Sequence, residues 1–167
     1  MEEPSRTLRK RILNISSVPT AKSDPAGIDI PAVATVVVTS EHPSHPIDYV
    51  FDDYDQAGAR HWVAAKPGEQ CVIIDFDTPQ TIHQIALTID EKEVQRLQEL
   101  TVSVSSDGGR SYREVVRQEY NFSPPGTTRE YENWTMPPTR VSHLRLQIKP
   151  DKGGKPCYAT LTSLILH

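Results

Sequence analysis

Short runs of alternating apolar and polar residues follow one another along most of the chain. The alternation is clearest at residues 100–105 (LTVSVS), where leucine and valine occupy every second position. Residues 33–39 (VATVVVT) and 71–76 (CVIIDF) are more continuously apolar and rich in β-branched side chains. A period of two indicates a half-buried strand, and a short apolar run between turn residues indicates a buried one. The pattern therefore predicts strands at these positions.

Five further segments have the same strand-like character, and they are residues 82–89, 112–119, 130–135, 141–148 and 159–166. Residues 67–68 and 107–109 provide turns, and Pro137-Pro138 is expected to separate two strands. Residues 90–98 alone have a helix-like composition, over a length that suits one or two turns or a loop. About eight strands with almost no helix predict an all-β fold, an antiparallel jelly-roll β-sandwich.

The length of 167 residues suits one domain with an extension at its N-terminus. Residues 1–31 contain a short basic stretch followed by a segment rich in serine, proline and alanine, which is typical of a flexible connection. We expect them to form a peripheral arm, to which residues 12–15 could add an edge strand. Residues 32–167 then form the sandwich domain.

Net charge and hydrophobic content exclude several classes of partner. The formal net charge of −4 argues against a protein that binds the phosphate backbone, so nucleic acid is not an expected ligand. No apolar run approaches the length of a membrane span. The first residues lack the apolar region of a signal peptide, so a cytoplasmic location is expected, or secretion if a signal segment once preceded residue 1. Two cysteines are too few for a disulfide framework.

A long acidic loop lies between the predicted strands at 33–39 and 71–76. Residues 40–59 carry five carboxylates, a concentration of oxygen ligands that could hold calcium, with Asp52 and Asp55 as candidates. A solvated acidic loop is the alternative explanation. Trp62 follows this loop, and we expect its indole to fill the core because a loop tryptophan buries a large apolar area.

The same loop contains the best candidates for catalysis. His42, His45 and Asp48 could form the metal site of a hydrolase, although a proline-flanked loop lacks the regular spacing that fixes metal ligands. The chain contains none of the GxSxG, HExxH, P-loop or CxxC patterns. We therefore expect a binding protein and not an enzyme.

Several landmarks follow one another in a recognisable order: Phe51-Asp52, Trp62, the turn Ser105-Ser106-Asp107-Gly108-Gly109-Arg110-Ser111-Tyr112, Leu144-Arg145-Leu146, and residues 159–164 near the end. This order resembles the discoidin-like family, also called coagulation factor 5/8 type C or galactose-binding-like domains. The resemblance covers roughly residues 33–167 and implies a jelly-roll sandwich that binds ligands through its loops.

The resemblance also bears on calcium. Many carbohydrate-binding members of this family hold a structural calcium through an Asp after the first strand, a Thr or Ser two positions before the tryptophan, and a Glu in the last strand. Asp52 matches the first ligand, but Arg60 and Ser163 stand at the other two positions. The resemblance thus implies that no cofactor is bound here.

A second, local similarity covers residues 60–69 (RHWVAAKPGE) together with Ile82-His83. This segment resembles the N-terminal domain of the scaffold protein of single-strand-break repair. It implies a metal-free domain and keeps open a second function, that of an intracellular adaptor which binds other proteins.

The long loops of a sandwich gather on a rigid scaffold, where recognition residues are usually placed. A sugar site needs an aromatic face and a few charged groups that bridge hydroxyls. We therefore predict a non-catalytic module that binds carbohydrate through loops at one end, with a protein ligand as the alternative. The candidate binding residues are His45, Asp53, Tyr54 and Arg60 in the first loop, Phe122 and Arg129 around the second, and Lys155 and Tyr158 in the third.

Overall fold

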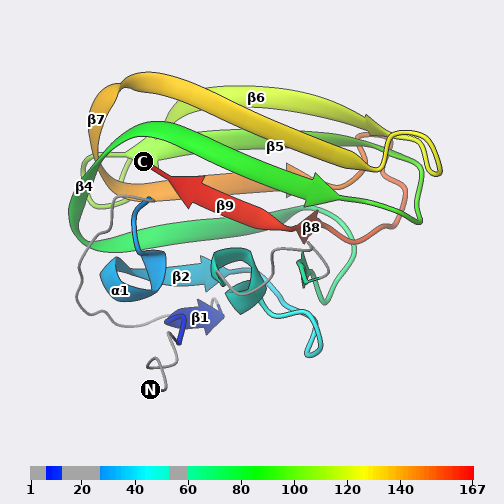
Figure 1. Ribbon diagram of the computed structural model, residues 1–167, viewed down its shortest axis with the longest axis horizontal. Helices are drawn as coiled ribbons and strands as arrows, with labels where there is room; N and C mark the ends of the chain where they lie inside the picture. Colours follow the sequence, from blue (N-terminus) through cyan, green and yellow to red (C-terminus); the bar gives the residue numbers. More distant parts are fainter. Residues whose placement is uncertain (1–6, 13–26, 53–59) are drawn as a thin grey trace, which may run out of the picture.

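The computed structural model describes residues 7–12, 27–52 and 60–167. Figure 1 shows strands running lengthwise in two layers, with little helix. The described elements are β1 (Lys10–Ile12), α1 (Ile30–Val33), β2 (Ala34–Val38), the 3-10 helix η1 (Ile47–Phe51), β3 (Trp62–Val63), β4 (Gln70–Asp90), β5 (Arg96–Ser105), β6 (Arg113–Phe122), β7 (Arg129–Lys149), β8 (Thr160–Leu161) and β9 (Ser163–Leu166). This confirms the predicted all-β sandwich.

Two strands of 21 residues, β4 and β7, belong to both layers. The first part of β4 pairs with β2 and with the second part of β7, in a layer ordered β1-β2-β4-β7-β5-β6. The second part of β4 pairs with the first part of β7 and with β9. In Figure 1 both long strands curve over at the same side of the molecule. Their curvature joins the two layers into one sandwich.

Register shifts explain two differences from the sequence-based expectation. Pro137-Pro138 was expected to end a strand, but β7 continues through both prolines. The pairing of β4 with β7 shifts between Ile82 and Gln84, and the prolines lie opposite this shift, where no ladder hydrogen bond requires an N–H. The same shift allows Ile82 and Ile85 to be buried together, although strict alternation places them on opposite faces.

Residues 90–98 do not form a helix. β4 ends at Asp90, a short connection follows, and β5 begins at Arg96, so the loop alternative is the observed one. Each of the eight segments predicted as strands overlaps a strand, although Val33 belongs to α1 and residues 159–166 are divided between β8 and β9. Trp62 is fully buried as expected, and its indole Nε1 donates a hydrogen bond to the Ser40 carbonyl at 3.0 Å.

Part of the expected N-terminal arm belongs to the core. β1 pairs in parallel with β2, and the Arg9 guanidinium contacts the Asp77 carboxylate at 2.7 Å. Leu8 and Ile30 are buried among the apolar side chains between the layers. The core therefore extends into a segment that sequence composition placed at the periphery. Within the described residues, no helix has the length and apolar character needed to cross a membrane.

Candidate functional site

A pocket of about 610 Å³ lies at the end of the sandwich where three connections meet. The β2–β3 connection and β3 form one wall, the β4–β5 connection forms another, and the β7–β8 connection forms the third. In Figure 1 the β4–β5 and β7–β8 connections lie at the right-hand end, and β3 lies just below β8. Pockets of roughly 300–1,000 Å³ are typical of small-ligand sites.

Three histidines line the first wall. The centroids of the His42 and His45 rings are 5.6 Å apart, and the rings of His45 and His61 stack at 5.0 Å. Backbone hydrogen bonds fix this wall, because the His42 N–H donates to the Val63 carbonyl at 2.8 Å and the Val63 N–H donates to the His45 carbonyl at 3.2 Å. Burial and the neighbouring His45 lower the pKa of His61. The row of imidazoles is therefore held in place by β3.

Two carboxylates at the end of β4 form the opposite wall. Asp90 lies 3.2 Å from the Arg129 guanidinium and accepts a hydrogen bond from the Thr162 hydroxyl, also at 3.2 Å. Glu91 accepts a hydrogen bond from the Val94 backbone N–H at 2.6 Å and lies 3.4 Å from Arg96. Both residues are largely buried, and each is oriented by a guanidinium group. Their orientation suits them to accept hydrogen bonds from a ligand.

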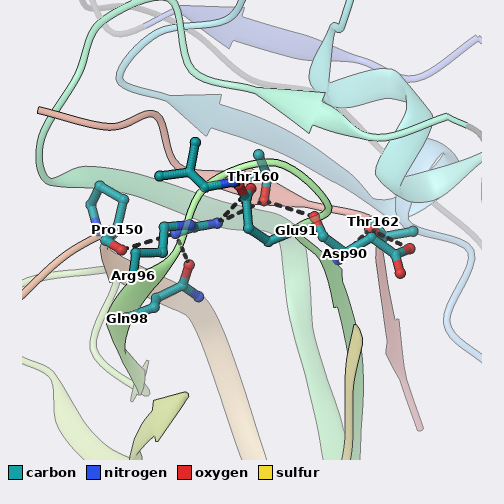
Figure 2. Close-up of polar contacts among 8 residues, drawn as sticks. Asp90, Glu91, Arg96, Gln98, Pro150, Thr160 and Thr162 are labelled. Carbon is teal, nitrogen blue, oxygen red and sulfur yellow. Dashed lines mark hydrogen bonds and ion pairs between the residues drawn. The ribbon is translucent and has the colours of Figure 1, made fainter. Parts of the chain in front are cut away.

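Arg96 links the walls of the pocket, as Figure 2 shows. Its side chain has 0% exposure and donates hydrogen bonds to Gln98, to the Pro150 carbonyl at 3.0 Å and to the Thr160 hydroxyl at 3.2 Å. Burial lowers its pKa, which the negative charge of Glu91 partly offsets. One buried side chain therefore connects the β4–β5 connection, β5 and the β7–β8 connection.

Two apolar side chains lie exposed at the rim. Tyr158 lines the third wall and is 49% exposed, and Val94 on the second wall is also exposed. Large side chains at the mouth of a pocket that also carries charged residues offer apolar contact area to a ligand with both polar and apolar faces.

A sequence model of the F5/8 type C domain matches residues 35–161 of the chain. The chain belongs to this family. A comparison with curated protein sequences found no significant match. The resemblance noted in the sequence is thereby confirmed for the domain family, while the local similarity to the repair scaffold stays a prediction.

Solved structures share the fold of this F5/8 type C domain. A pectin-binding carbohydrate-binding module is 17% identical with a TM-score of 0.60, and the match covers 81% of this chain and 90% of the module. The family 32 module of Clostridium perfringens NanJ, in complex with galactose, is 14% identical with a TM-score of 0.59. This match covers 80% of this chain and 92% of the module. The family 32 module of AlyQ, in complex with 4,5-unsaturated mannuronic acid, is 17% identical with a TM-score of 0.56. This match covers 79% of this chain and 92% of the module.

The pocket of this F5/8 type C domain contains two of the binding residues predicted from sequence, His45 and Tyr158, and also His42, which was a candidate for a metal site. Arg129 does not line the pocket but contacts Asp90 in its wall. Lys155 stands beside the third wall, where its ammonium donates to the Gln95 carbonyl at 2.6 Å. Their roles in binding remain predictions.

Two other predicted residues that the structure describes, Phe122 and Arg60, do not line this pocket. Phe122 is fully buried beneath Arg96, with 5.1 Å between the guanidinium carbon and the ring centroid, so its predicted contact with a ligand is wrong. Arg60 does not line the pocket, and it contacts Asp52 at 3.1 Å and lies over the Tyr49 ring. Three further candidates, Asp53, Tyr54 and Asp55, lie outside the described residues.

Sequence reasoning missed His61, Asp90, Glu91 and Arg96 as pocket residues. A useful signal was present, since Asp90 and Glu91 come directly after an apolar strand, where side chains emerge at a loop end. Arg96 gave no such signal, because it stands in a stretch of mixed charges with a helix-like composition.

The described residues do not fit a metal ion. Across residues 7–12, 27–52 and 60–167, no group of three or more His, Cys, Asp or Glu side chains is arranged to hold one. Asp48 forms an ion pair with Lys10, so it does not join His42 and His45 in a metal site. At the family's calcium position the Arg60 guanidinium contacts Asp52, and a cation there would be repelled.

Proposed function

We propose that this F5/8 type C domain is a non-catalytic carbohydrate-binding module whose ligand enters the loop-end pocket. One observation carries the proposal. The pocket combines anchored hydrogen-bonding groups on its walls with the exposed apolar side chains Tyr158 and Val94 at its rim. This combination matches the chemistry of a pyranose ring, which presents hydroxyls at its edge and C–H groups on its faces.

The walls supply both kinds of hydrogen-bonding partner. Asp90 and Glu91 accept from hydroxyl groups, and their guanidinium partners hold them in one orientation before a ligand arrives. The His42 Nδ1 accepts from the Ser44 backbone N–H at 3.1 Å, which leaves its Nε2–H to donate to a hydroxyl, and His45 and His61 add further imidazole nitrogens to the same wall. The Tyr158 ring offers a face or an edge to the C–H side of the sugar.

The structural neighbours support the same ligand class. Modules of the same fold have been solved in complex with galactose and with 4,5-unsaturated mannuronic acid, and another is described as pectin-binding. Because those modules are only 14–17% identical to this chain, they favour carbohydrate as a class without selecting one sugar.

The pocket is better suited to binding than to glycoside hydrolysis. Hydrolysis requires a pair of carboxyl groups, one of which donates a proton to the leaving oxygen. Among the described residues that line the pocket, every carboxylate (Asp90, Glu91 and Glu93) belongs to one wall, and Asp90 and Glu91 are each engaged by an arginine, so the lining places no second carboxyl group on the far side of a bound ring. We therefore propose recognition without catalysis.

A glycan array followed by NMR chemical-shift mapping with a positive glycan tests this proposal. We expect shifts at residues 42–45, 61, 90–94 and 156–160. Tyr158→Ala should weaken binding about tenfold, because it removes the main aromatic contact at the rim. Tyr131→Ala is the matched control, since Tyr131 is 61% exposed on β7 outside the pocket lining, and its affinity should equal that of the wild type.

Two results would contradict the proposal. Shifts centred away from the pocket, with Tyr158→Ala unchanged in affinity, would place the binding site elsewhere. Absence of binding to every glycan, together with capture of one specific protein, would favour the adaptor function instead.

A further inference from the structure

The three imidazoles of the pocket form a continuous row, in which His45 lies between the other two. Its ring centroid is 5.6 Å from that of His42 and 5.0 Å from that of His61. The Nδ1 atom of His45 is buried and has no hydrogen-bond partner among the described residues. A protonated ring would carry its charge along a wall that a ligand must contact.

The charged groups that face this row come from every other wall. The β4–β5 connection contributes Asp90, Glu91, Lys92 and Glu93, β5 contributes Arg96, and the β7–β8 connection contributes Cys157 and Tyr158. Arg129 on β7 stands behind Asp90 as its ion-pair partner. With neutral imidazoles the lining holds three carboxylates against two basic groups. Only histidine has an ordinary pKa between pH 5 and 8, so the row decides how the pocket's charge changes in that range.

We propose that the His42–His45–His61 row makes this pocket proton-linked, so that it favours neutral saccharides at neutral pH and gains affinity for carboxylate-bearing saccharides on acidification. The inference rests on the proposed function and specifies the class of sugar that the same pocket accepts. Asp90, Glu91 and Glu93 oppose an anionic ligand when the imidazoles are neutral. Protonation of the row places positive charge beside the ligand and reverses that balance.

Thermodynamic linkage makes the coupling between proton binding and sugar binding reciprocal. A carboxylate bound beside the row stabilises the imidazolium form, so binding of an acidic sugar takes up protons from the buffer. Burial and then the neighbouring His45 ring lower the pKa of His61, and proton uptake by the row therefore spreads over a broad pH range. One charge pair at a hydrated surface changes affinity about fivefold.

Galactose and galacturonic acid are a matched pair of probes, because they differ only in the carboxylate at C6. NMR titration of the wild type with each sugar at pH 7.5 and pH 5.0, at constant ionic strength, gives a ratio of affinities at each pH. The carboxylate stays ionised at both values, since such groups titrate below about pH 4. We expect the affinity for galacturonic acid relative to that for galactose to be about fivefold higher or more at pH 5.0 than at pH 7.5.

Variants locate the protons that cause the change. His42→Gln, His45→Gln and His61→Gln should each reduce the shift in the ratio, and the triple variant should abolish it. His83→Gln is the control, since His83 is exposed on β4 and does not line the pocket, and it should keep the full shift. Calorimetry of the wild type in two buffers of different ionisation enthalpy should show proton uptake with galacturonic acid and none with galactose.

The outcomes are distinct. An equal ratio at both pH values, in a protein that binds either sugar, overturns the proton link and leaves the proposed function intact. A shift that persists in the triple variant also overturns it, because the protons then lie elsewhere. If neither sugar binds at either pH although another glycan does, the choice of ligand class is overturned. Absence of binding to any glycan overturns the proposed function and this inference together.

Discussion

Arg96 carries a charged side chain that has no contact with solvent, directly beneath the pocket. Such a charge is stable only when hydrogen bonds replace its water, and here one carboxylate, one backbone carbonyl and two polar side chains do so. Because these partners come from separate connections, the residue fixes the relative positions of the pocket walls. Its role is to position Glu91 and Thr160, and the ligand need not touch it.

Removal of Arg96 tests that role. Arg96→Met should reduce the free energy of unfolding by about 3–5 kcal/mol, because it leaves the Glu91 charge buried without its partner. Arg96→Lys should recover part of the stability but bind glycan more weakly than wild type, since an ammonium cannot reach all four partners in the fork geometry of a guanidinium. Urea denaturation and glycan titration measure the two effects. Arg110→Met, at an exposed position, is the control and should match wild type in both.

Asp107 anchors the turn between β5 and β6 by hydrogen bonds to its neighbours. Its carboxylate accepts from the backbone N–H groups of Arg110 and Ser111 and from the hydroxyls of Ser105 and Ser111. These donors, the Ser111 hydroxyl first among them, hold the pKa of Asp107 well below its ordinary value of 3.8.

A lowered folded-state pKa fixes the direction of the pH effect. The contribution of Asp107 is fully present above pH 3.8 and is lost as the pH falls toward the lowered value in the folded state. Asp107→Asn should therefore have a lower urea midpoint than wild type at pH 7, and the difference should narrow below about pH 4. Glu69→Gln, at an exposed site, should follow the wild-type profile. A difference that stays constant down to pH 2.5 would show that the turn depends on shape alone.

At the scale of single residues, sequence indicated some of the site. His45 and Tyr158 were identifiable because they stand in loops of a β-protein, where side chains of that kind are available to a ligand. Phe122 was misplaced for a physical reason. It ends β6 with its ring turned into the core beneath Arg96, and alternation alone does not say which side of a strand end meets solvent.

At the scale of elements, the individual strands were predictable and their continuity was not. Local hydrophobic patterns mark where β4 and β7 are buried, but each pattern is interrupted where the strand passes from one layer to the other. Around Gln80 and Pro137 the chain turns a corner without ending the strand, through a register shift. A corner of this kind depends on pairing between distant segments, which a single sequence does not display.

β1 is the element whose contribution was most underestimated. Leu8, just before it, is 6% exposed in the core, and Ile12 at its other end is 48% exposed. Leu8→Ala should lower the free energy of unfolding by about 2–5 kcal/mol, because it leaves a cavity between the layers. Ile12→Ala is the matched control and should stay within about 0.5 kcal/mol of wild type. Equal and small effects in urea denaturation would mean that residues 7–12 are peripheral to the stable domain.

At the scale of the molecule, the sandwich creates the site by bringing together residues far apart in sequence. His42 and Thr160 line one pocket although 118 positions separate them in the chain. The curved strands β4 and β7 belong to both layers and hold the layers in a fixed relative position. The connections at the pocket end are therefore held in place as well. The loop end was predictable from the fold class, but the composition of the pocket depended on which loops meet there.

Calcium gives the test that belongs to the whole domain, because a structural ion bound at the loop end would stabilise the entire fold. A ligand at a hundredfold excess over its Kd adds about 2.7 kcal/mol of stability, which would raise the Tm by about 5–10 °C in a chain of this size. We expect the Tm to be the same in millimolar calcium and in a chelator, since the Arg60 guanidinium already forms an ion pair with the Asp52 carboxylate at 3.1 Å.

The same expectation can be tested by restoring the family's ligands. Arg60→Thr combined with Ser163→Glu removes the competing cation and supplies two oxygen ligands, so this double variant should be stabilised by calcium and not by magnesium, which requires a tighter octahedral site. Arg60→Thr alone is the matched control and should respond weakly. A calcium-dependent rise in Tm of the wild type would contradict the prediction, because it would mean that carboxylates of the acidic loop complete a site despite Arg60.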